Sequence, residues 1–578
     1  AAVAISLLNA LTLSPALCAL IMTPHQTEGG NKMSFSSRFH VAFDTAFHRL
    51  VMKYKVAVLF MLKRKWLAAS LLVVACAGLV ILMTTTKTGL VPKEDMGTVF
   101  VDVRTSPGNS LQETKVIMDE VDSCIRSIPQ IKYYSNVTGN SQLSGQGACN
   151  GMFTIRLKDW DERTQKEDAI DEIIDEIHRR TAAISSADIM AFTRPMIPGY
   201  GVSSGFEIYV QDQKGGTTAD LLKYTRQLID ALNKRPEIAR ATTSFDTKFP
   251  QYLVEVDAAV CKRNGVSPSD VLNTLSGYIG GSYASNMNRF SKLYRVMVQA
   301  SPEFRLDTKA LHNIYVRNSS GEMTPINQYL KLTRIYGSEI LTRFNLFSAI
   351  QVNGTPATGY SSGQAIQAVK EVAAQILPTG YGYEFGGMSR EESSTGNTTT
   401  LVFVICVVFI YLILCALYES LFVPMAVILS VPFGLAGSFL FAKMFGLENN
   451  IYLQTGLIML IGLLSKTAIL LTEYASERRH HGMSIIQAAI SAAQVRLRPI
   501  LMTSLTMIFG MLPMMFSTGV GANGNISIGV GTVGGMLIGT IALLFIVPPL
   551  FMVFQYLQEK LMPARQLPQP EKETNKGE

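Results

Sequence analysis

One residue stands out for its chemistry, a lysine inside a long apolar stretch. Lys466 lies in LIGLLSKTAILLTEYA, about 15 residues from the start of that stretch. A charged side chain at the bilayer centre costs roughly 2.5–3.5 kcal/mol, so it needs an acidic partner or must reach the interface. The apolar stretches hold no Asp or Glu between their boundary residues. We therefore expect the acidic partners outside this chain, where a lysine facing carboxylates that bind and release protons forms a proton relay.

Two residues of the next apolar stretch could extend such a relay. Arg496 opens RLRPILMTS, and Thr503 follows seven residues later on the same helical face. A hydroxyl there could carry a hydrogen-bond chain toward Lys466. The alternative is that Arg496 only anchors the helix at the inner surface and that Thr503 bonds to its own backbone. The residues alone leave both interpretations open.

These side chains require long apolar helices to position them. The chain is 48% hydrophobic and 16% charged, against about 25% charged in soluble domains. A net charge of +7 is small for 578 residues and argues against nucleic-acid binding, and seven cysteines exclude a disulfide scaffold. Seven stretches are long enough to cross about 30 Å of hydrocarbon: 1–22, 66–85, 399–418, 421–442, 451–472, 500–516 (extended back past Pro499) and 525–554.

Basic residues set the expected orientation. Segments 23–65 and 473–499 are rich in Lys and Arg, which predicts the cytoplasmic side for both. Four spans separate them, so they should share a side. The block 86–398 is then expected outside, and the tail 555–578 inside. Because the sequence begins in an apolar run and the number of spans is odd, we expect that a preceding half is missing.

Segment 23–65 also contains an expected surface helix. Within 36–62, Phe39, Phe43 and Phe47 recur every four residues, and Leu50 and Val51 continue the stripe. This spacing is typical of an amphipathic helix lying along a membrane surface. The alternative is an ordinary cytoplasmic linker.

The outer block is expected to repeat a small α/β unit. Over 86–200, strands and helices follow the order β-α-β-β-α-β of ferredoxin-like folds, and Ser110 with Glu113 forms a capping box for the first helix. The pattern recurs over 201–279, with strands near 239–245 and 251–257 and a helix that opens at Ser267. It resumes over 341–398. We expect 280–340 to be an inserted subdomain.

Several motifs are set aside. GVGTVG and GVGANG match a dinucleotide-binding pattern, but neither follows a soluble strand. Gly531, Gly535 and Gly539 instead predict a ridge for close helix packing. The sequence shows no P-loop and no metal-ligand spacing, and we do not expect His480–His481 to bind metal. We therefore expect no cofactor, and transport would draw on an ion gradient.

Together the elements resemble a known transporter family. The order of span, surface helix, span, outer block and five spans resembles the C-terminal half of a resistance–nodulation–division (RND) transporter. It most resembles the hydrophobe/amphiphile multidrug efflux type. The matching strings are LTLSPALCALIM (11–22), LVPKEDMG (90–97), LKDWDER (157–163), GVSPSDV (265–271), ALYESLFVPMAVILSVPFG (416–434), GLLSKTAILLTEYA (462–475) and RLRPILMTSLTMIFGMLP (496–513).

The resemblance implies a function and partners. It implies a multi-pass bacterial inner-membrane protein with seven of twelve spans (five of them within 399–554), and drug/proton antiport without enzyme activity. Lys466, Arg496 and Thr503 match relay positions, with acidic partners in the fourth span of a missing N-terminal half. The block 86–398 would hold periplasmic porter subdomains and a docking subdomain. The whole pump would be a homotrimer working with a periplasmic adaptor and an outer-membrane channel.

One departure from the family concerns the small-molecule substrate. The family's Phe- and Gly-rich loop is here NSQLSGQGACN (140–150), without an aromatic residue, which favours a more polar substrate. Tyr134 and Phe153 flank this loop, while Met190 and Phe192 match an entrance strand; these four are the candidate substrate residues. Two alternatives are metal efflux through the thioethers of Met152, Met190 and Met196, and a membrane-anchored module that does not transport. Cys124 and Cys149 could pair.

Overall fold

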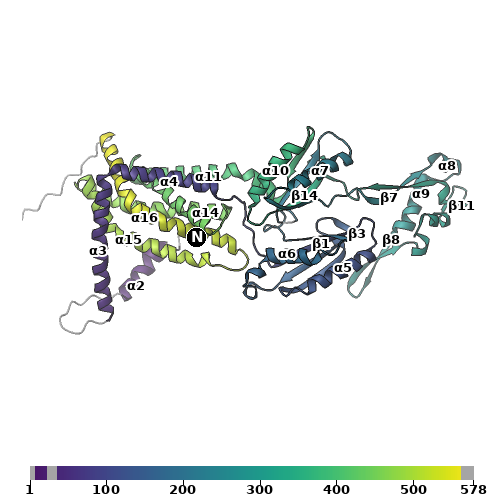
Figure 1. Ribbon diagram of the computed structural model, residues 1–578, viewed down its shortest axis with the longest axis horizontal. Coiled ribbons are helices and arrows are strands. Elements are labelled where there is room, and N and C mark those ends of the chain that lie inside the picture. Colours follow the sequence, from purple (N-terminus) through teal and green to yellow (C-terminus); the bar gives the residue numbers. More distant parts are fainter. Residues whose placement is uncertain (1–4, 6, 22–34, 203, 562–578) are drawn as a thin grey trace, which may run out of the picture.

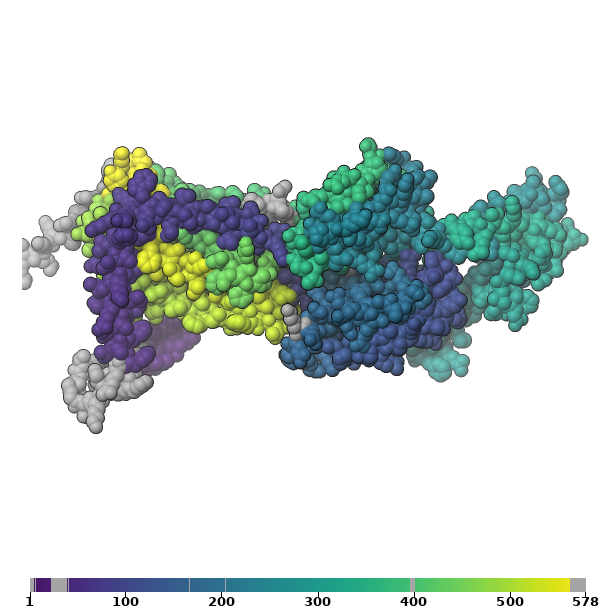
Figure 2. All heavy atoms as spheres, viewed as in Figure 1, coloured from purple at the N-terminus to yellow at the C-terminus, as the bar shows by residue number. Residues whose placement is uncertain are grey.

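The chain divides along its long axis into a helical bundle, two α/β units and a distal inserted unit (Figure 1). The computed structural model describes residues 5, 7–21, 35–202 and 204–561. In the space-filling view the second α/β unit lies against the first, and the inserted unit projects at the end far from the bundle (Figure 2).

Six helical segments among the described residues are long and apolar enough to cross a membrane. The expected span 1–22 is covered only in part, by the apolar segments η1 (Asn9–Leu13) and α2 (Ser14–Ile21), and its remainder lies outside the described residues. The stretch 500–516 does extend back through Pro499. The six segments are α4 (Lys65–Thr85), α11 (Gly387–Tyr418), α12 with α13 (Val423–Ile428, Val431–Met444), α14 (Ile451–His480), α15 (Ile485–Met515) and α16 (Ala522–Leu561).

Glycines let α16 approach its neighbours closely. A Cβ placed on Gly535 would lie 2.9 Å from the Gly434 carbonyl oxygen of α13, and one on Gly539 would lie 3.0 Å from the Gly434 Cα. The same position on Gly531 would meet Leu453 of α14 at 2.5 Å. The ridge predicted from Gly531, Gly535 and Gly539 is therefore confirmed, and α16 is the central helix of the bundle.

Helix α3 (Phe35–Lys63) crosses the end of the bundle at a steep angle to α4, α15 and α16 (Figure 1). Its Phe39, Phe43 and Phe47 rings stack at 6.4 and 6.2 Å. The buried Tyr54 hydroxyl donates to the Leu544 carbonyl oxygen of α16 at 2.7 Å. That carbonyl lacks its usual helical donor because the residue four positions later is Pro548. That α3 lies along a membrane surface stays a prediction.

The first α/β unit is one antiparallel sheet in the strand order β2-β3-β1-β4. The capping box at Ser110 and Glu113 is present at the start of α5. Val99, Val101 and Val103 of β1 face the helices in the core, so the alternate residues of β1 face the other way. The elements are β1 (Thr98–Thr105), α5 (Leu111–Arg126), β2 (Ile131–Ser141), β3 (Gly145–Leu157), η2 (Trp160–Glu162), η3 (Lys166–Asp168), α6 (Ile170–Thr181) and β4 (Ala187–Phe192).

The second α/β unit repeats the order β-α-β-β-α-β from two separate parts of the chain. Its sheet runs β13-β14-β5-β15, and β6 also pairs with β14. The elements are β5 (Phe206–Asp212), α7 (Thr218–Leu232), β6 (Ile238–Thr242), β13 (Thr342–Phe344), β14 (Phe347–Pro356), α10 (Ser362–Ile376) and β15 (Tyr381–Phe385). Because α11 begins two residues after β15, the unit runs directly into a membrane helix.

The inserted unit begins earlier than the expected residue 280. Strand β7 (Phe249–Val256) pairs with β12 (Leu330–Gly337), and neither joins the second unit's sheet. Cys261, Val271 and Tyr329 share one core. The strand near 251–257 and the helix at Ser267 therefore belong to the insertion, because their apolar faces pack there. Its other elements are α8 (Ala258–Arg263), α9 (Pro268–Leu275), η4 (Ser276–Gly280), β8 (Ser282–Arg289), β9 (Lys292–Val298), η5 (Pro302–Phe304), η6 (Thr308–Asn313), β10 (Tyr315–Arg317), β11 (Met323–Pro325) and η7 (Ile326–Gln328).

Candidate functional site

Lys466 lies near the middle of α14, with about 14 residues, or ~21 Å of helix, on either side. Its side chain is exposed in this chain, as are Met459, Gly462 and Glu473 on the same helical face. Among the described residues no carboxylate forms an ion pair with it. Glu473, on its own face, is seven residues away, or ~10 Å along the axis. The face of α14 that carries Lys466 is thus open, with a cation at mid-helix that is unpaired among the described residues and with Glu473 nearer the helix's C-terminal end.

Arg496 contacts the same helix closer to its C-terminal end. Its guanidinium carbon lies 4.9 Å from the ring centroid of Tyr474, and the guanidinium of Arg478 lies at the same distance from that ring. The buried Nε of Arg496 has no hydrogen-bond partner among the described residues. Cation–π contacts of this kind stabilise by ~1 kcal/mol. They fix the depth of α15 relative to α14 at this point.

Thr503 lies at nearly the same depth as Lys466. Helices α14 and α15 are consecutive and antiparallel, so seven residues from Arg496 on α15 correspond to about seven residues back from Tyr474 on α14, which is the level of Thr467. The Thr503 hydroxyl is directed at the Pro499 and Ile500 carbonyl oxygens, at 3.1 and 3.0 Å. The Thr503 hydroxyl therefore donates to the backbone of its own helix, as in the alternative to a relay role that the sequence left open.

Outside the bundle, a cavity of about 1100 Å³ lies between the two α/β units and reaches the bundle's outer end. Its walls are β4 and α6 of the first unit, residues 355–362 of the second unit, and the loop before α14. Met190 and the largely buried Phe192 of β4 line it, and their role in an entrance stays a prediction. Tyr134 and Phe153 do not line the cavity, because Phe153 is fully buried on the helix side of the sheet and Tyr134 packs against it.

Charged side chains stand beside the aromatic wall of this cavity. Phe192 stacks on Phe100 at 6.0 Å, and the guanidinium carbon of Arg194 lies 4.4 Å from the Phe100 ring centroid. Arg240 of β6 reaches across the gap to Asp188 of β4 at 3.0 Å. The Arg240–Asp188 pair joins the open edges of the two sheets. Sequence reasoning missed Arg194 and Arg240, since only the fold brings them to the cavity.

A buried acid lies behind the same wall. Asp102 faces away from the helices, between Met152 of β3 and Met190 of β4. Burial raises the pKa of its carboxyl to about 6, and one of its oxygens has no partner among the described residues. The available sequence signal was a charged residue inside the apolar alternation VFVDV.

The described residues offer little support for a resident metal. No group of three or more His, Cys, Asp and Glu side chains among them could hold an ion. Met190 and Met196 line the cavity together with Met388, whereas Met152 lies on β3 of the same sheet as Met190 and does not line the cavity. Cys124 and Cys149 are both free thiols.

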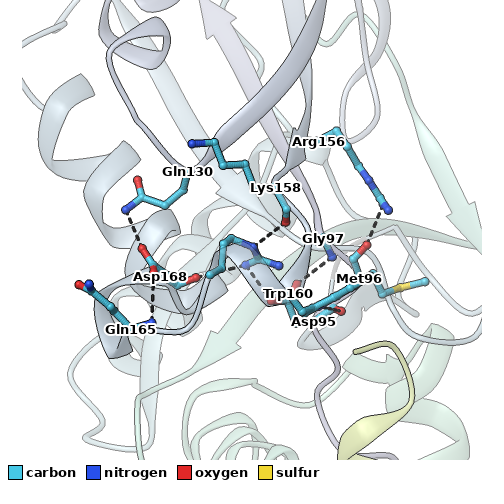
Figure 3. Close-up of polar contacts among 10 residues, drawn as sticks. Asp95, Met96, Gly97, Gln130, Arg156, Lys158, Trp160, Gln165 and Asp168 are labelled. Carbon is cyan, nitrogen blue, oxygen red and sulfur yellow. Dashed lines mark hydrogen bonds and ion pairs between the residues drawn. The ribbon is translucent and has the colours of Figure 1, made fainter. Parts of the chain in front are cut away.

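The linker from α4 into the first unit carries two acidic residues, one of which binds the bundle and the other the first unit. Glu94 accepts hydrogen bonds from the backbone N–H groups of Asn523 and Gly524, at 3.2 and 2.8 Å, in the first turn of α16. Asp95 forms an ion pair with the buried guanidinium of Arg163 at 2.9 Å. The Trp160 indole N–H donates to the Asp95 carbonyl oxygen at 3.2 Å (Figure 3). The strings LVPKEDMG and LKDWDER thus meet in space.

Comparisons with known proteins match almost the whole chain. A family model described as the AcrB/AcrD/AcrF family matches residues 1–555. The chain is 34% identical over 560 residues to the toluene efflux pump membrane transporter TtgB of Pseudomonas putida, covering 96% of this chain and 53% of TtgB. It is 33% identical over 558 residues to the multidrug resistance protein MdtF of Escherichia coli, covering 96% of this chain and 53% of MdtF. The chain spans about half the length of the curated relatives it matches.

Proposed function

This chain belongs to the AcrB/AcrD/AcrF family of RND transporters, and from that premise we propose that it is part of a proton-driven efflux pump in the bacterial inner membrane. Its relatives are transporters rather than enzymes. The observation that carries the proposal is Lys466, a cation at mid-helix on an open face of α14 with no carboxylate partner among the described residues. An isolated ammonium there is costly in hydrocarbon.

The proposed coupling is an exchange of ion pairs. Carboxylates from a segment outside this chain face Lys466 and lose the ion pair when they bind protons. The common depth of Thr503 and Lys466 supports a hydroxyl contribution, provided that Thr503 turns away from its own carbonyls. Arg496 then holds α15 in register through Tyr474. One charge moved through 100 mV supplies about 2.3 kcal/mol for each transport step.

The proposed substrate path is the cavity between the α/β units. Met190 and Phe192 supply an apolar surface, and Arg194 and Arg240 supply charge. This mixture supports a substrate more polar than a flat aromatic drug. Tyr134 and Phe153 are left out of the path because they pack in the core.

The proposed setting follows the family. We place the α/β units in the periplasm as porter subdomains and the inserted unit as a docking subdomain. The assembly we propose is a homotrimer that includes a further half carrying the acidic residues, a periplasmic adaptor and an outer-membrane channel. Metal export is the second candidate, since three methionine thioethers line the cavity.

The test is a pair of lysine substitutions measured in cells that express the chain together with the coding sequence upstream of residue 1. Lys466→Ala is expected to lower energised dye efflux at least tenfold at equal membrane expression. Lys443→Ala is the matched control, because this exposed lysine at the end of α13 bonds only to Thr85 among the described residues, and we expect efflux within twofold of wild type. Unchanged efflux in Lys466→Ala would refute the relay. Silver or copper export without dye export would favour the metal candidate, and neither activity would indicate a non-transporting module.

A further inference from the structure

Besides its direct continuation into α11, the second α/β unit meets the bundle through an extended segment of the α4–β1 linker. Thr88 forms a parallel bridge with Asn449, the residue two positions before α14. The Gly89 N–H donates to the Asn449 carbonyl oxygen at 3.3 Å, and the Gly363 N–H of α10 donates to the Thr88 carbonyl oxygen at 3.3 Å. The linker is therefore hydrogen-bonded to the bundle on one side and to the second unit on the other. We call residues 87–90 with these partners the joint.

Two carboxylates are packed into this joint. Glu392, in the second turn of α11, accepts a hydrogen bond from the Ser362 hydroxyl at 2.8 Å. Glu448 lies in the loop before α14 and contacts Gly89. A Cβ placed on Gly89 would lie 2.5 Å from the Glu448 Oε2 atom and 3.3 Å from the Ser362 Oγ atom. A side chain at residue 89 would displace the Glu448 carboxylate from the joint. Both acids are half-buried and also line the large cavity, so water can exchange protons with them.

The electrostatics of the pair favour a bound proton. Burial and, to a smaller extent, the neighbouring Glu448 together raise the pKa of Glu392 to about 7, although hydrogen bonds from the Ser362 hydroxyl and the Leu90 backbone oppose the shift. Burial also raises the pKa of Glu448, while the ammonium groups of Lys93 and Lys87 lower it. The Lys87 ammonium already donates to the Gly359 carbonyl oxygen.

The remaining charges near the pair are either engaged or distant. On the linker, Glu94 and Asp95 bind the α16 N-terminus and Arg163. On α11, Arg390 and Glu391 are exposed. The far wall of the cavity carries Asp171, Asp175, His178, Arg194 and Arg240. Lys87 and Lys93 compensate Glu448 in part, but two neighbouring half-buried carboxylates still cost free energy when both are ionised.

We propose that Glu392 and Glu448 make the joint sensitive to pH, so that a proton held by the pair keeps the second α/β unit and the bundle locked through the linker. Opening the joint would expose both carboxylates to water and return them toward their ordinary, lower pKa values. The closed joint therefore binds the proton more tightly than the open one. It is favoured at acidic pH and weakens by up to about tenfold per pH unit as pH rises toward neutrality.

The proposal concerns conformational locking and does not depend on efflux. The test is hydrogen exchange, corrected for intrinsic rates, on the whole chain in detergent between pH 5.5 and 8. Peptides covering 86–90 and 359–364 report the joint. In the wild type we expect their protection to fall at least tenfold from the acidic to the alkaline end. Glu392→Gln, which is neutral at every pH, should stay protected and lose most of this dependence.

Two further variants make the result decisive. Glu448→Gln removes the neighbouring charge, so the wild-type transition should move to lower pH. Glu120→Gln, an exposed acid on α5 of the first unit, is the control and should follow the wild type. If Glu392→Gln folds poorly, the proposal is judged by whether Glu448→Gln moves the pH transition in protection to lower pH. Protection independent of pH in the wild type, or full pH dependence retained in Glu392→Gln, would overturn the proposal. Loss of efflux in Lys466→Ala would leave all these outcomes unchanged.

Discussion

The buried ion pair between Arg163 and Asp95 should be among the most sensitive contacts of the first α/β unit. The Arg163 side chain is 2% exposed and Asp95 is 26% exposed. The guanidinium also donates to the carbonyl oxygens of Lys158 and Asp168, at 2.8 and 3.2 Å. One side chain therefore ties the linker to two turns that follow β3, close to the Asp168 network with Gln130 and Gln165 (Figure 3).

Replacing Arg163 by Met keeps most of the side-chain volume and removes every one of these bonds. Breaking a buried pair costs about 3–5 kcal/mol because the remaining charge loses its partner. Since Asp95 is partly exposed, water compensates for some of this loss, and we expect about 3 kcal/mol, the lower end of that range. That free energy corresponds to roughly a 100-fold faster local opening.

The assay is native-state hydrogen exchange of peptides from β3 and α6, in the whole chain at one fixed pH. Lys132→Met is the matched control, because Lys132 pairs with Asp159 at 3.0 Å with both side chains about half exposed. Exposed pairs contribute at most about 1 kcal/mol, so its exchange should change by no more than about fivefold. If Arg163→Met behaves like Lys132→Met, the Arg163 pair does not stabilise the unit as argued.

Three other substitutions test local packing and capping. Gly535→Leu should lower the thermal stability of the detergent-solubilised chain by an amount equivalent to about 1–3 kcal/mol or more, because a Cβ at residue 535 meets the Gly434 carbonyl oxygen at 2.9 Å. Gly510→Ala is the control, since no atom lies within 4 Å of the added Cβ. Equal losses of stability in the two variants would contradict the ridge. Tyr54→Phe should speed exchange in α3 by an amount equivalent to about 1–3 kcal/mol, because it leaves a buried α16 carbonyl without its donor, and unchanged exchange would argue against that bond. Ser110→Ala should destabilise the start of α5 by about 1 kcal/mol, seen as faster exchange there and nowhere else in the unit.

Local rules allowed the sequence to predict single elements well. The capping box at Ser110 and Glu113 is present, and the ridge of Gly531, Gly535 and Gly539 packs as expected. Each depends on residues within a few turns of one another, so spacing alone identifies it. The pairing of β7 with β12 was missed, because alternation marks a strand but does not name its partner.

The candidate substrate residues show the same limit and one avoidable error. Phe153, Ile155 and Leu157 alternate on one face of β3 and are fully buried, which period-two patterning could have indicated. Phe153 was a candidate because it is aromatic and flanks the loop 140–150. Arg194 and Arg240 reach the cavity only through the arrangement of two sheets, and no local pattern predicts that. Among the described residues no carboxylate pairs with Lys466, so its acidic partner stays a prediction.

The linker explains how the bundle and the α/β units are connected more firmly than by chain continuity. Glu94 binds the first turn of α16, while Asp95, the next residue, binds Arg163 in the first unit. Their Cα atoms are held about 3.8 Å apart by the peptide bond, so neither acid can follow its own partner far without breaking the other contact. Thr88, which precedes Glu94 on the same linker, binds the second unit as well. We therefore expect a shift of α16 along its axis to displace the first unit directly, whereas this shift is passed through the linker to the second unit while the joint at residues 87–90 is closed.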